Sequence, residues 1–245
     1  MTERSVHLVG SLPADSTREA LTWATSILGN TIGPCMPDGE TGDRSDWVNR
    51  LVENLRTHPD LQLVRDGEWS GYTDTPAFRV RKGRHLRWID LDYLAEFDKS
   101  WKAYEDLVHG SGRRFQIGIP GHFDVAAIAF GFNLARALRN LAPFREATIR
   151  EMAAIWSRAK GLAVFQLEVP IELIMLTKLP RAAQPAAANR MAREILRLVE
   201  AAPAGTRFGL HLCLGDLNNC LLYTSDAADE GVEVGVSGGG GGCGG

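Results

Sequence analysis

The stretch FGLHLCLG, residues 208–215, carries the pattern that decides the fold. Side chains alternate between the two faces of a β-strand, so its Phe and Leu residues share one face and its remaining residues share the other. That second face carries Gly209, His211, Cys213 and Gly215. One face can therefore be covered by helices, while the other offers small and polar groups.

Two earlier stretches alternate in the same way, AVFQLEV at 163–169 and FQIGIPGH at 115–122. Their polar faces carry Gln166 and Glu168, and Gln116 and His122, with the polar groups gathered toward the carboxyl end. Such strands predict an α/β protein of the TIM (β/α)₈-barrel type, with a site at the carboxyl-terminal mouth. A doubly wound open sheet is the alternative, but its central strands are usually apolar on both faces.

Short apolar segments alternate with helical ones along the chain, as in βα units. The expected strands cover 6–10, 31–35, 115–119, 162–169 and 208–214, and the expected helices cover 16–28, 45–55 and 91–108 and lie within 123–159 and 171–201. Residues 59–90 break this rhythm with Gly, Pro and Trp and are interpreted as an insertion holding a hairpin over 77–89. A complete barrel has eight strands. We therefore expect residues 1–219 to form a partial barrel, truncated after about five βα units.

The composition fits an ordinary globular domain. The 245 residues are 44% hydrophobic and 23% charged, with a formal net charge of −3. Lys and Arg are scattered among acids, so neither a nucleic acid nor a membrane surface is expected as a partner. No apolar run approaches the roughly 18 residues of a membrane span. A cytoplasmic protein is expected, and its four cysteines are too few and too irregular for a disulfide framework.

The last segment, residues 220–245, is set apart from this domain. It begins with CLLYTSDAADE, which resembles the translation of a transposase adaptor used in sequencing libraries, and it ends in a glycine run. Glycine-rich sequence buries too little surface to offset its ordering entropy. We expect a non-native, disordered tail, with a natural flexible glycine-rich tail as the alternative.

His211 and Cys213 are candidate metal ligands because their i, i+2 spacing on a strand places both side chains on one side. A thiolate and an imidazole suit Zn²⁺, but they supply only half of a tetrahedral site. The alternative is a core histidine beside a buried apolar cysteine.

Candidate substrate-binding groups occur at the ends of the other expected strands. Glu168 ends its strand on the inward face and could hold a substrate ammonium or orient a histidine, although an exposed strand-end acid is the alternative. PDGETGDR at 37–44 predicts a tight turn that presents Glu40, or else a solvated turn that caps a helix at Asp43 or Ser45. Ser11 follows the first strand and could contact a ligand carboxylate or cap a helix.

Five segments together resemble the catalytic barrel of the cobalamin-independent methionine synthases. That family carries I-G-S-F-P, H-G-E-x-x-R-x-D-M-V, T-G-P-V-T, Q-I-D-E-P and H-x-C-Y in this order. The corresponding segments here are VGSLP at 9–13, DGETGDRSDWV at 38–48, IGIPGH at 117–122, QLEVP at 166–170 and HLCLGD at 211–216.

The resemblance implies roles for six residues. Ser11, Glu40, Glu168 and His122 would bind the substrate, with Glu168 also the catalytic group, and His211 and Cys213 would be the first two zinc ligands. The family's remaining ligands, a Glu and a Cys, lie in later strands. The sequence also departs from the family pattern, with Asp38 in place of His, Val169 in place of Glu and Leu214 in place of Tyr. These departures favour a divergent relative with a different thiol or methyl donor.

The function implied by the resemblance is zinc-dependent transfer of a methyl or other alkyl group to a small-molecule thiol, as in methionine biosynthesis. The alternatives are another enzyme of the wider uroporphyrinogen decarboxylase and methionine synthase superfamily, or a barrel that binds a ligand without turnover. With only two protein ligands, the chain as written is expected to bind zinc weakly and to lack activity. The sequence does not indicate an oligomeric state.

Overall fold

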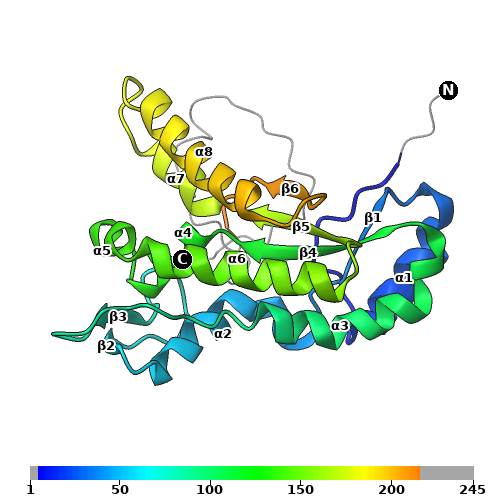
Figure 1. The fold of residues 1–245 in the computed structure, drawn as a ribbon, viewed down its shortest axis with the longest axis horizontal. Coiled ribbons are helices and arrows are strands. Elements are labelled where there is room, and N and C mark those ends of the chain that lie inside the picture. The colour runs from blue at the N-terminus through cyan, green and yellow to red at the C-terminus, as the bar shows by residue number, and fades with distance from the viewer. Residues whose placement is uncertain (1–4, 216–245) are drawn as a thin grey trace.

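The computed structural model describes residues 5–215, and the expected non-native tail over 220–245 lies outside them. The described chain is a mixed α/β structure built on a four-stranded parallel sheet (Figure 1). The strands are β1 (Cys35–Pro37), β4 (Arg114–Pro120), β5 (Ala163–Glu168) and β6 (Arg207–His211), which neighbour one another in this order. Strand order therefore follows chain order.

Each link between neighbouring strands contains a short helix followed by a long one. The first α-helices after β1, β4 and β5 are α2 (Trp47–Asn54), α4 (His122–Ala129) and α7 (Pro170–Thr177). The long helices are α3 (Tyr93–Leu107), α6 (Leu141–Arg158) and α8 (Gln184–Ala201). Helix α1 (Thr17–Leu28) packs on α3, α3 on α6, and α6 on α8. The long helices thus form one layer alongside the sheet (Figure 1).

The remaining elements are short. They are α5 (Leu134–Arg139) and the 3₁₀ turns η1 (Gly29–Thr31), η2 (Gly42–Asp46), η3 (Leu55–Thr57) and η4 (His109–Ser111). Helix α1 begins as the sequence predicts, because the Ser16 hydroxyl accepts a hydrogen bond from the Glu19 backbone N–H at 3.2 Å. The predicted helix over 45–55 is divided among η2, α2 and η3.

The core lies between the sheet and the long helices. Phe115 of β4 is fully buried and meets Phe97, Trp101 and Tyr104 of α3, with ring centroids between 4.9 and 5.9 Å apart. Phe97, Trp101 and Tyr104 recur on one side of α3 at helical spacing. The apolar face of the alternating FQIGI pattern is thus buried against a helix, as the sequence predicts.

The insertion contains a hairpin, but its pairing differs from the prediction. Strand β2 (Leu61–Arg65) pairs antiparallel with β3 (Ala77–Val80), and residues 81–89 are not a strand. The prediction of a hairpin over 77–89 was wrong because Leu61–Arg65, rather than a segment after Val80, is the partner of β3.

The predicted first strand, 6–10, is also not a strand. Its only backbone ladder contact in the described chain is a single parallel bridge between Val6 and Ile32. Instead, the Gln116 side-chain amide donates to the carbonyls of Leu8 and Val9 at 3.0 and 2.7 Å, and that of Gln166 donates to Val9 at 2.7 Å. The segment therefore lies against the polar face of the sheet, and within residues 5–215 the sheet has four strands, whereas five were expected.

Strand β6 ends at His211, before the predicted end at 214, and within the described residues it pairs with β5 alone. Phe208 packs against Phe165 of β5, but Leu210 and Leu212 are 50% and 60% exposed. Among residues 5–215 no helix follows β6 to cover them.

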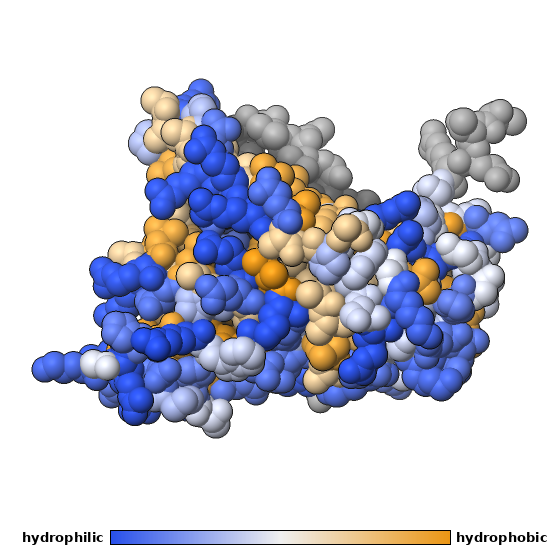
Figure 2. Space-filling view, in the orientation of Figure 1, coloured by the Kyte–Doolittle hydropathy of each residue, from blue (hydrophilic) through white to orange (hydrophobic). Residues whose placement is uncertain are grey.

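Hydrophobic side chains are visible toward the middle of an otherwise mostly hydrophilic face (Figure 2). No helix in the described part of the chain is long and apolar enough to cross a membrane.

Candidate functional site

A cavity of about 780 Å³ opens at the carboxyl ends of the strands. Its walls come from the segment before α1, the loop after β1, the insertion, and the residues that end or follow β5 and β6. The predicted site residues among its lining are Ser11, Glu40, Glu168, His211 and Cys213. Groups from five distant parts of the sequence therefore meet in one concave site, the arrangement expected of a ligand-binding centre.

The loop after β1 places Glu40. The Glu40 backbone N–H donates to Oδ1 of Asp38 at 3.1 Å, and Oδ2 of Asp38 lies 2.7 Å from Nη1 of Arg44 in a buried ion pair. Gly39 has φ +84° and packs so closely on α1 that a Cβ there would lie 2.7 Å from that of Ala20. Only glycine meets both conditions. The turn holds Glu40 in the left-handed region at φ +45° with its side chain almost fully buried.

The carboxylates of Glu40 and Glu168 converge above Gly118 of β4. A Cβ at this glycine would lie 2.5 Å from Oε1 of Glu40 and 3.0 Å from Oε1 of Glu168. Burial, and next the Glu168 carboxylate, raise the pKa of Glu40 to about 7, although the Ser11 hydroxyl opposes this by donating to Oε2 at 2.6 Å. Two acids so close in a partly dry site attract a cation or share a proton.

Residues 7–12, which line one part of the cavity, lie against the same polar face of the sheet. A Cβ at Gly10 would lie 3.0 Å from both carboxylate oxygens of Glu40, so the backbone here approaches the acid closely. Gln116 and Gln166, which hold the carbonyls of this segment, also contact each other, with Nε2 of Gln116 3.2 Å from Oε1 of Gln166. Both glutamines are buried. The sequence placed them on the polar face but gave them no role.

His211 and Cys213 lie beside Glu168. Nδ1 of His211 is 3.7 Å from Oε1 of Glu168 and has no hydrogen-bond partner among the described atoms, and Cys213 is half-buried. The Cys213 sulfur, followed by the Glu168 carboxylate, raises the pKa of His211 to about 10, while burial acts against it. Within residues 5–215 no group of three or more His, Cys, Asp or Glu side chains is arranged to hold a metal ion.

His122 is the predicted site residue that the structure does not bring to the cavity. It begins α4, is fully buried, and its Nε2 lies 3.9 Å from Oε2 of Glu194 on α8. Burial lowers the pKa of His122 to about 4. The alternation of FQIGIPGH placed it on the polar face, but β4 ends at Pro120 and the start of α4 turns the side chain toward α8.

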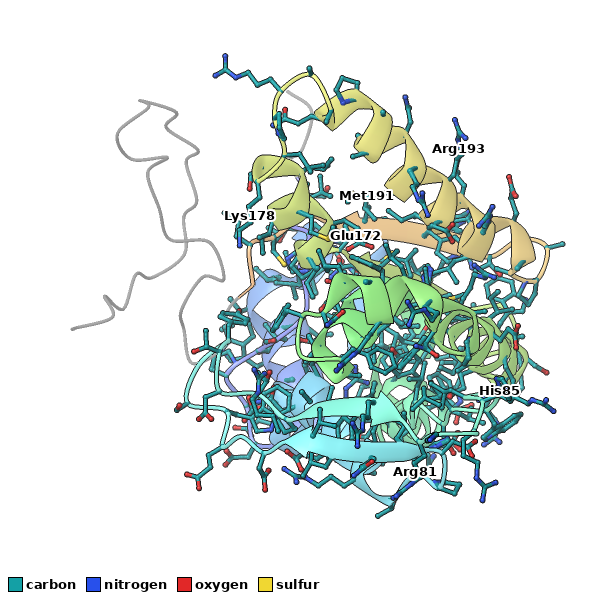
Figure 3. All side chains as sticks on the ribbon, turned by 90° about the vertical axis from the view of Figure 1, so that its left-hand side faces the viewer. Arg81, His85, Glu172, Lys178, Met191 and Arg193 are labelled. Atoms are coloured by element: carbon teal, nitrogen blue, oxygen red, sulfur yellow. The ribbon has the colours of Figure 1, made fainter. Side chains whose placement is uncertain are left out.

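A second pair of buried acids lies outside the cavity lining, between α4 and α7. A Cβ at Gly121 would lie 2.7 Å from Oδ2 of Asp124 and 3.6 Å from Oε1 of Glu172, so the two carboxyl groups share one space. Oδ1 of Asp124 accepts from the Ile171 backbone N–H at 2.9 Å. Glu172 points inward from α7, whereas Lys178 after the same helix lies near the surface (Figure 3). Burial is the main cause that raises the pKa of both acids.

The sequence analysis did not predict the part of the cavity wall that the insertion and α4 provide. Trp69, Tyr72 and Thr75 of the insertion line it, together with Ile128 of α4 and Phe132 after that helix. The one available signal was the concentration of aromatic residues in a segment that breaks the βα rhythm, and that signal does not say which way the loop folds.

One solved structure resembles this fold. A methyltransferase from Methanosarcina mazei matches with a TM-score of 0.50 and 14% sequence identity, over 89% of this chain and 67% of that chain. No protein-family model and no curated protein sequence matches the chain. At this identity the comparison shows that the two chains share an α/β fold.

Proposed function

We propose that this chain is a methyltransferase-like protein that transfers a methyl or other alkyl group to a thiol, in the manner of the cobalamin-independent methionine synthases. The observation that carries the proposal is the convergence of Ser11, Glu40, Glu168, His211 and Cys213 on one cavity. These residues come from four of the five segments that resemble the family. The shared fold with a protein named as a methyltransferase supports the same class of reaction.

The sheet is proposed to be part of a (β/α)₈ barrel. Its strands follow one another in chain order, and the long helices succeed one another in a single layer. A doubly wound sheet reverses its strand order and carries helices on both faces. The position of the site at the carboxyl ends of the strands agrees with barrel enzymes.

The polar end of the cavity suits a thiol substrate that also carries an amine. Glu40 and Glu168 would bind the ammonium group, because a cation between two acids relieves their mutual repulsion. Ser11 fixes Glu40 through its hydroxyl at 2.6 Å, and Glu168 can orient His211. In the reaction, the thiol sulfur forms a bond to the methyl carbon as the bond from that carbon to its carrier breaks, and the thiol proton leaves to solvent.

His211 and Cys213 are the groups that would hold Zn²⁺, and Nδ1 of His211, which has no hydrogen-bond partner among residues 5–215 and lies beside a cysteine sulfur, fits that ion. Bound Zn²⁺ would keep the substrate sulfur deprotonated at neutral pH. Two protein ligands make a weak site, since zinc normally takes three or four.

One observation favours a barrel that binds its ligand without turnover. Asp38, Val169 and Leu214 depart from the family pattern, and an amine-bearing ligand could occupy the two carboxylates without any reaction. A metal titration separates the two functions.

Cobalt tests the metal site because it replaces zinc and gives a near-ultraviolet charge-transfer band with a thiolate ligand. With excess Co²⁺, we expect the band in the wild-type chain and in Cys35→Ser, which removes the other half-buried cysteine, and its loss in Cys213→Ser. Adding cysteamine should strengthen the band through a second sulfur.

Methyl transfer is then assayed with Zn²⁺ as the loss of free cysteamine thiol, with methylcobalamin and trimethylsulfonium as donors. Glu168→Gln should lower any rate by about tenfold or more. An equal cobalt band in all three proteins, or none in the wild type, would remove the metal from the proposal. Thiol loss would support the transferase over the binding protein, whereas a cobalt band that cysteamine does not strengthen would favour the binding protein.

A further inference from the structure

Two kinds of group line the cavity. The carboxylates of Glu40 and Glu168, with His211 and Cys213, form what is called here the polar end. A second group supplies apolar surface from α2, the insertion, α4 and the turn after it, next to the polar residues Asp46, Asn49 and Thr75; it consists of Val48, Trp69, Tyr72, Ile128 and Phe132. Thiol chemistry and ammonium binding need only the polar end. A volume of about 780 Å³ exceeds what a small amino thiol fills, since whole drug-sized ligands occupy about 300–1,000 Å³.

The aromatic wall is held by unusual backbone conformations. Five residues other than glycine have positive φ in the part of the chain that the structure describes. Three of them line this cavity: Glu40 at +45°, Trp69 at +60° and Phe132 at +60°. Such backbone conformations are unfavourable for residues other than glycine, and they tend to cluster at ligand-binding sites.

The loop that carries Trp69 and Tyr72 is braced from within. Asp74 accepts from the Ser70 hydroxyl at 2.5 Å and from the Ser70 backbone N–H at 3.3 Å, and its carbonyl accepts from the Trp69 N–H at 2.9 Å. At Gly67 a Cβ would lie 2.6 Å from the Asp74 carbonyl oxygen, so the two sides of the loop touch. Arg65 closes the base by donating to the Thr75 carbonyl at 3.0 Å.

The Trp69 side chain is itself fixed. Its indole N–H donates to Oε1 of Glu53 on α2 at 2.8 Å, which satisfies the polar edge of a half-buried ring that also lines the cavity. Phe132 is tied to the end of α4, because its N–H donates to the Ala127 carbonyl at 2.7 Å. A wall ordered before the ligand arrives loses little entropy on binding.

We propose that Trp69, Tyr72 and Phe132 form a subsite for a planar apolar group, such as an aromatic ring, carried by the same substrate whose amine meets Glu40 and Glu168. The proposal rests on the proposed function for the thiol, and it assigns substrate selection to the insertion. The substrate class is then an aryl-bearing amino thiol rather than a short aliphatic one.

Four probes separate the ring from the thiol: ethylamine, phenethylamine, cysteamine, and cysteamine with a benzyl substituent beside the nitrogen. Calorimetric titration of the full chain with Zn²⁺ present measures all four. We expect each ring-bearing probe to bind about tenfold or more tightly than its ring-free partner, as burial of one aromatic ring allows. Trp69→Ala and Tyr72→Ala should each reduce that advantage to about threefold or less.

Trp23→Ala is the matched control, because Trp23 is a half-exposed tryptophan on α1 outside the cavity lining. It should retain the full ring advantage. Trp69→Leu, which keeps an apolar side chain near Glu53, guards against a folding defect and should give an intermediate ratio. Circular dichroism checks the fold of each variant.

The outcomes distinguish the two proposals. Equal binding of ring-bearing and ring-free probes, or a ring advantage unchanged in both Trp69→Ala and Tyr72→Ala, would overturn the subsite. A ring advantage with no gain from the thiol would support the subsite and contradict the thiol-transfer function. Binding of none of the four probes would overturn both.

Discussion

Gly118 is the residue on which the two carboxylates of the site depend. It lies on the polar face of β4, and any side chain larger than hydrogen would occupy the space of Oε1 of Glu40 and Oε1 of Glu168. Gly209 of β6, two strands away, shares that face, but the nearest described atom to a Cβ there would be 3.9 Å away. A larger side chain at Gly118 would therefore collide with the two carboxylates, whereas one at Gly209 would meet no such neighbour among the described residues.

We expect Gly118→Ala to lower the free energy of unfolding by about 1–2 kcal/mol and to weaken cysteamine binding about tenfold or more, because Glu40 and Glu168 must move apart. Gly209→Ala should be neutral or slightly stabilising, since alanine reduces the freedom of the unfolded chain. Urea unfolding and calorimetric titration measure the two effects. Equal behaviour of the two variants would show that the carboxylates do not converge at Gly118.

Among the elements, α4 and α7 are joined through acids rather than through apolar contacts alone. Oδ1 of Asp124 accepts from the Ile171 N–H in the first turn of α7, while the other side of the same carboxyl faces Glu172. Two buried acids in one space cannot both ionise cheaply, so they hold at least one proton. Because the folded pKa of Asp124 lies above its unfolded value, the pair stabilises the fold most at low pH and loses that contribution as pH rises.

The Asp124→Asn variant keeps an acceptor for the Ile171 N–H but removes one ionisable group. Relative to the wild type, we expect its free energy of unfolding to improve by about 1–3 kcal/mol between about pH 5 and about pH 9. Urea unfolding at the two pH values measures this difference. Asp98→Asn, which changes a surface acid of α3, serves as the control. A pH-independent difference for Asp124→Asn would mean that the pair carries no shared proton.

The same elements show what sequence reasoning can reach. FQIGI and AVFQLEV were predicted correctly because burial on one face imposes a period of two, which the sequence displays directly. VHLVG has the same apolar character, but its carbonyls are taken by two glutamine side chains over 100 residues away in sequence. The periodicity of a sequence does not indicate such side-chain partners. It also does not indicate which strand pairs with β3.

Among the candidate-site residues, too, the positions at strand ends could be predicted from the sequence, and those that depend on helix starts or loop shape could not. Glu168 and His211 end their strands, Glu40 and Cys213 follow theirs, and parallel strands bring their carboxyl ends together. His122 lies two residues beyond the end of β4 and is already the first residue of α4. Trp69 reaches the cavity through a loop whose shape depends on Asp74 and Gly67, and no repeat in the sequence indicates that shape.

At the scale of the whole molecule, the segments that line the cavity differ in how many backbone hydrogen bonds hold them to the rest of the protein. β5 pairs with a strand on each side, and β4 pairs with β5 from Phe115 to Pro120. Within the described chain, the backbone of residues 7–12 is attached by the neighbouring bridge at Val6, by the Leu12 N–H to the Gly39 carbonyl at 2.9 Å, and by two glutamine amides, and the Ser11 hydroxyl donates to Glu40. A segment with so few backbone bonds opens locally at a lower free energy than the sheet unfolds.

We expect amides of residues 6–12 to exchange with deuterium faster than those of β4 and β5. Gln166→Leu, which removes the amide that holds the Val9 carbonyl, should speed that exchange several-fold while leaving β4 unchanged. Gln62→Leu, on the hairpin, is the control. Hydrogen exchange read by mass spectrometry tests this, and uniform exchange across the three segments would refute the expectation.

The loose attachment of residues 7–12 has a kinetic consequence. If this segment must detach before a bulky ligand enters, the observed association rate will stop rising with ligand concentration once detachment becomes the slow step, and the plateau will equal the opening rate. A ligand that bridges Ser11 and the strands would then close the wall behind itself. The dissociation rate, more than the association rate, would then determine the affinity of the cavity for its ligand.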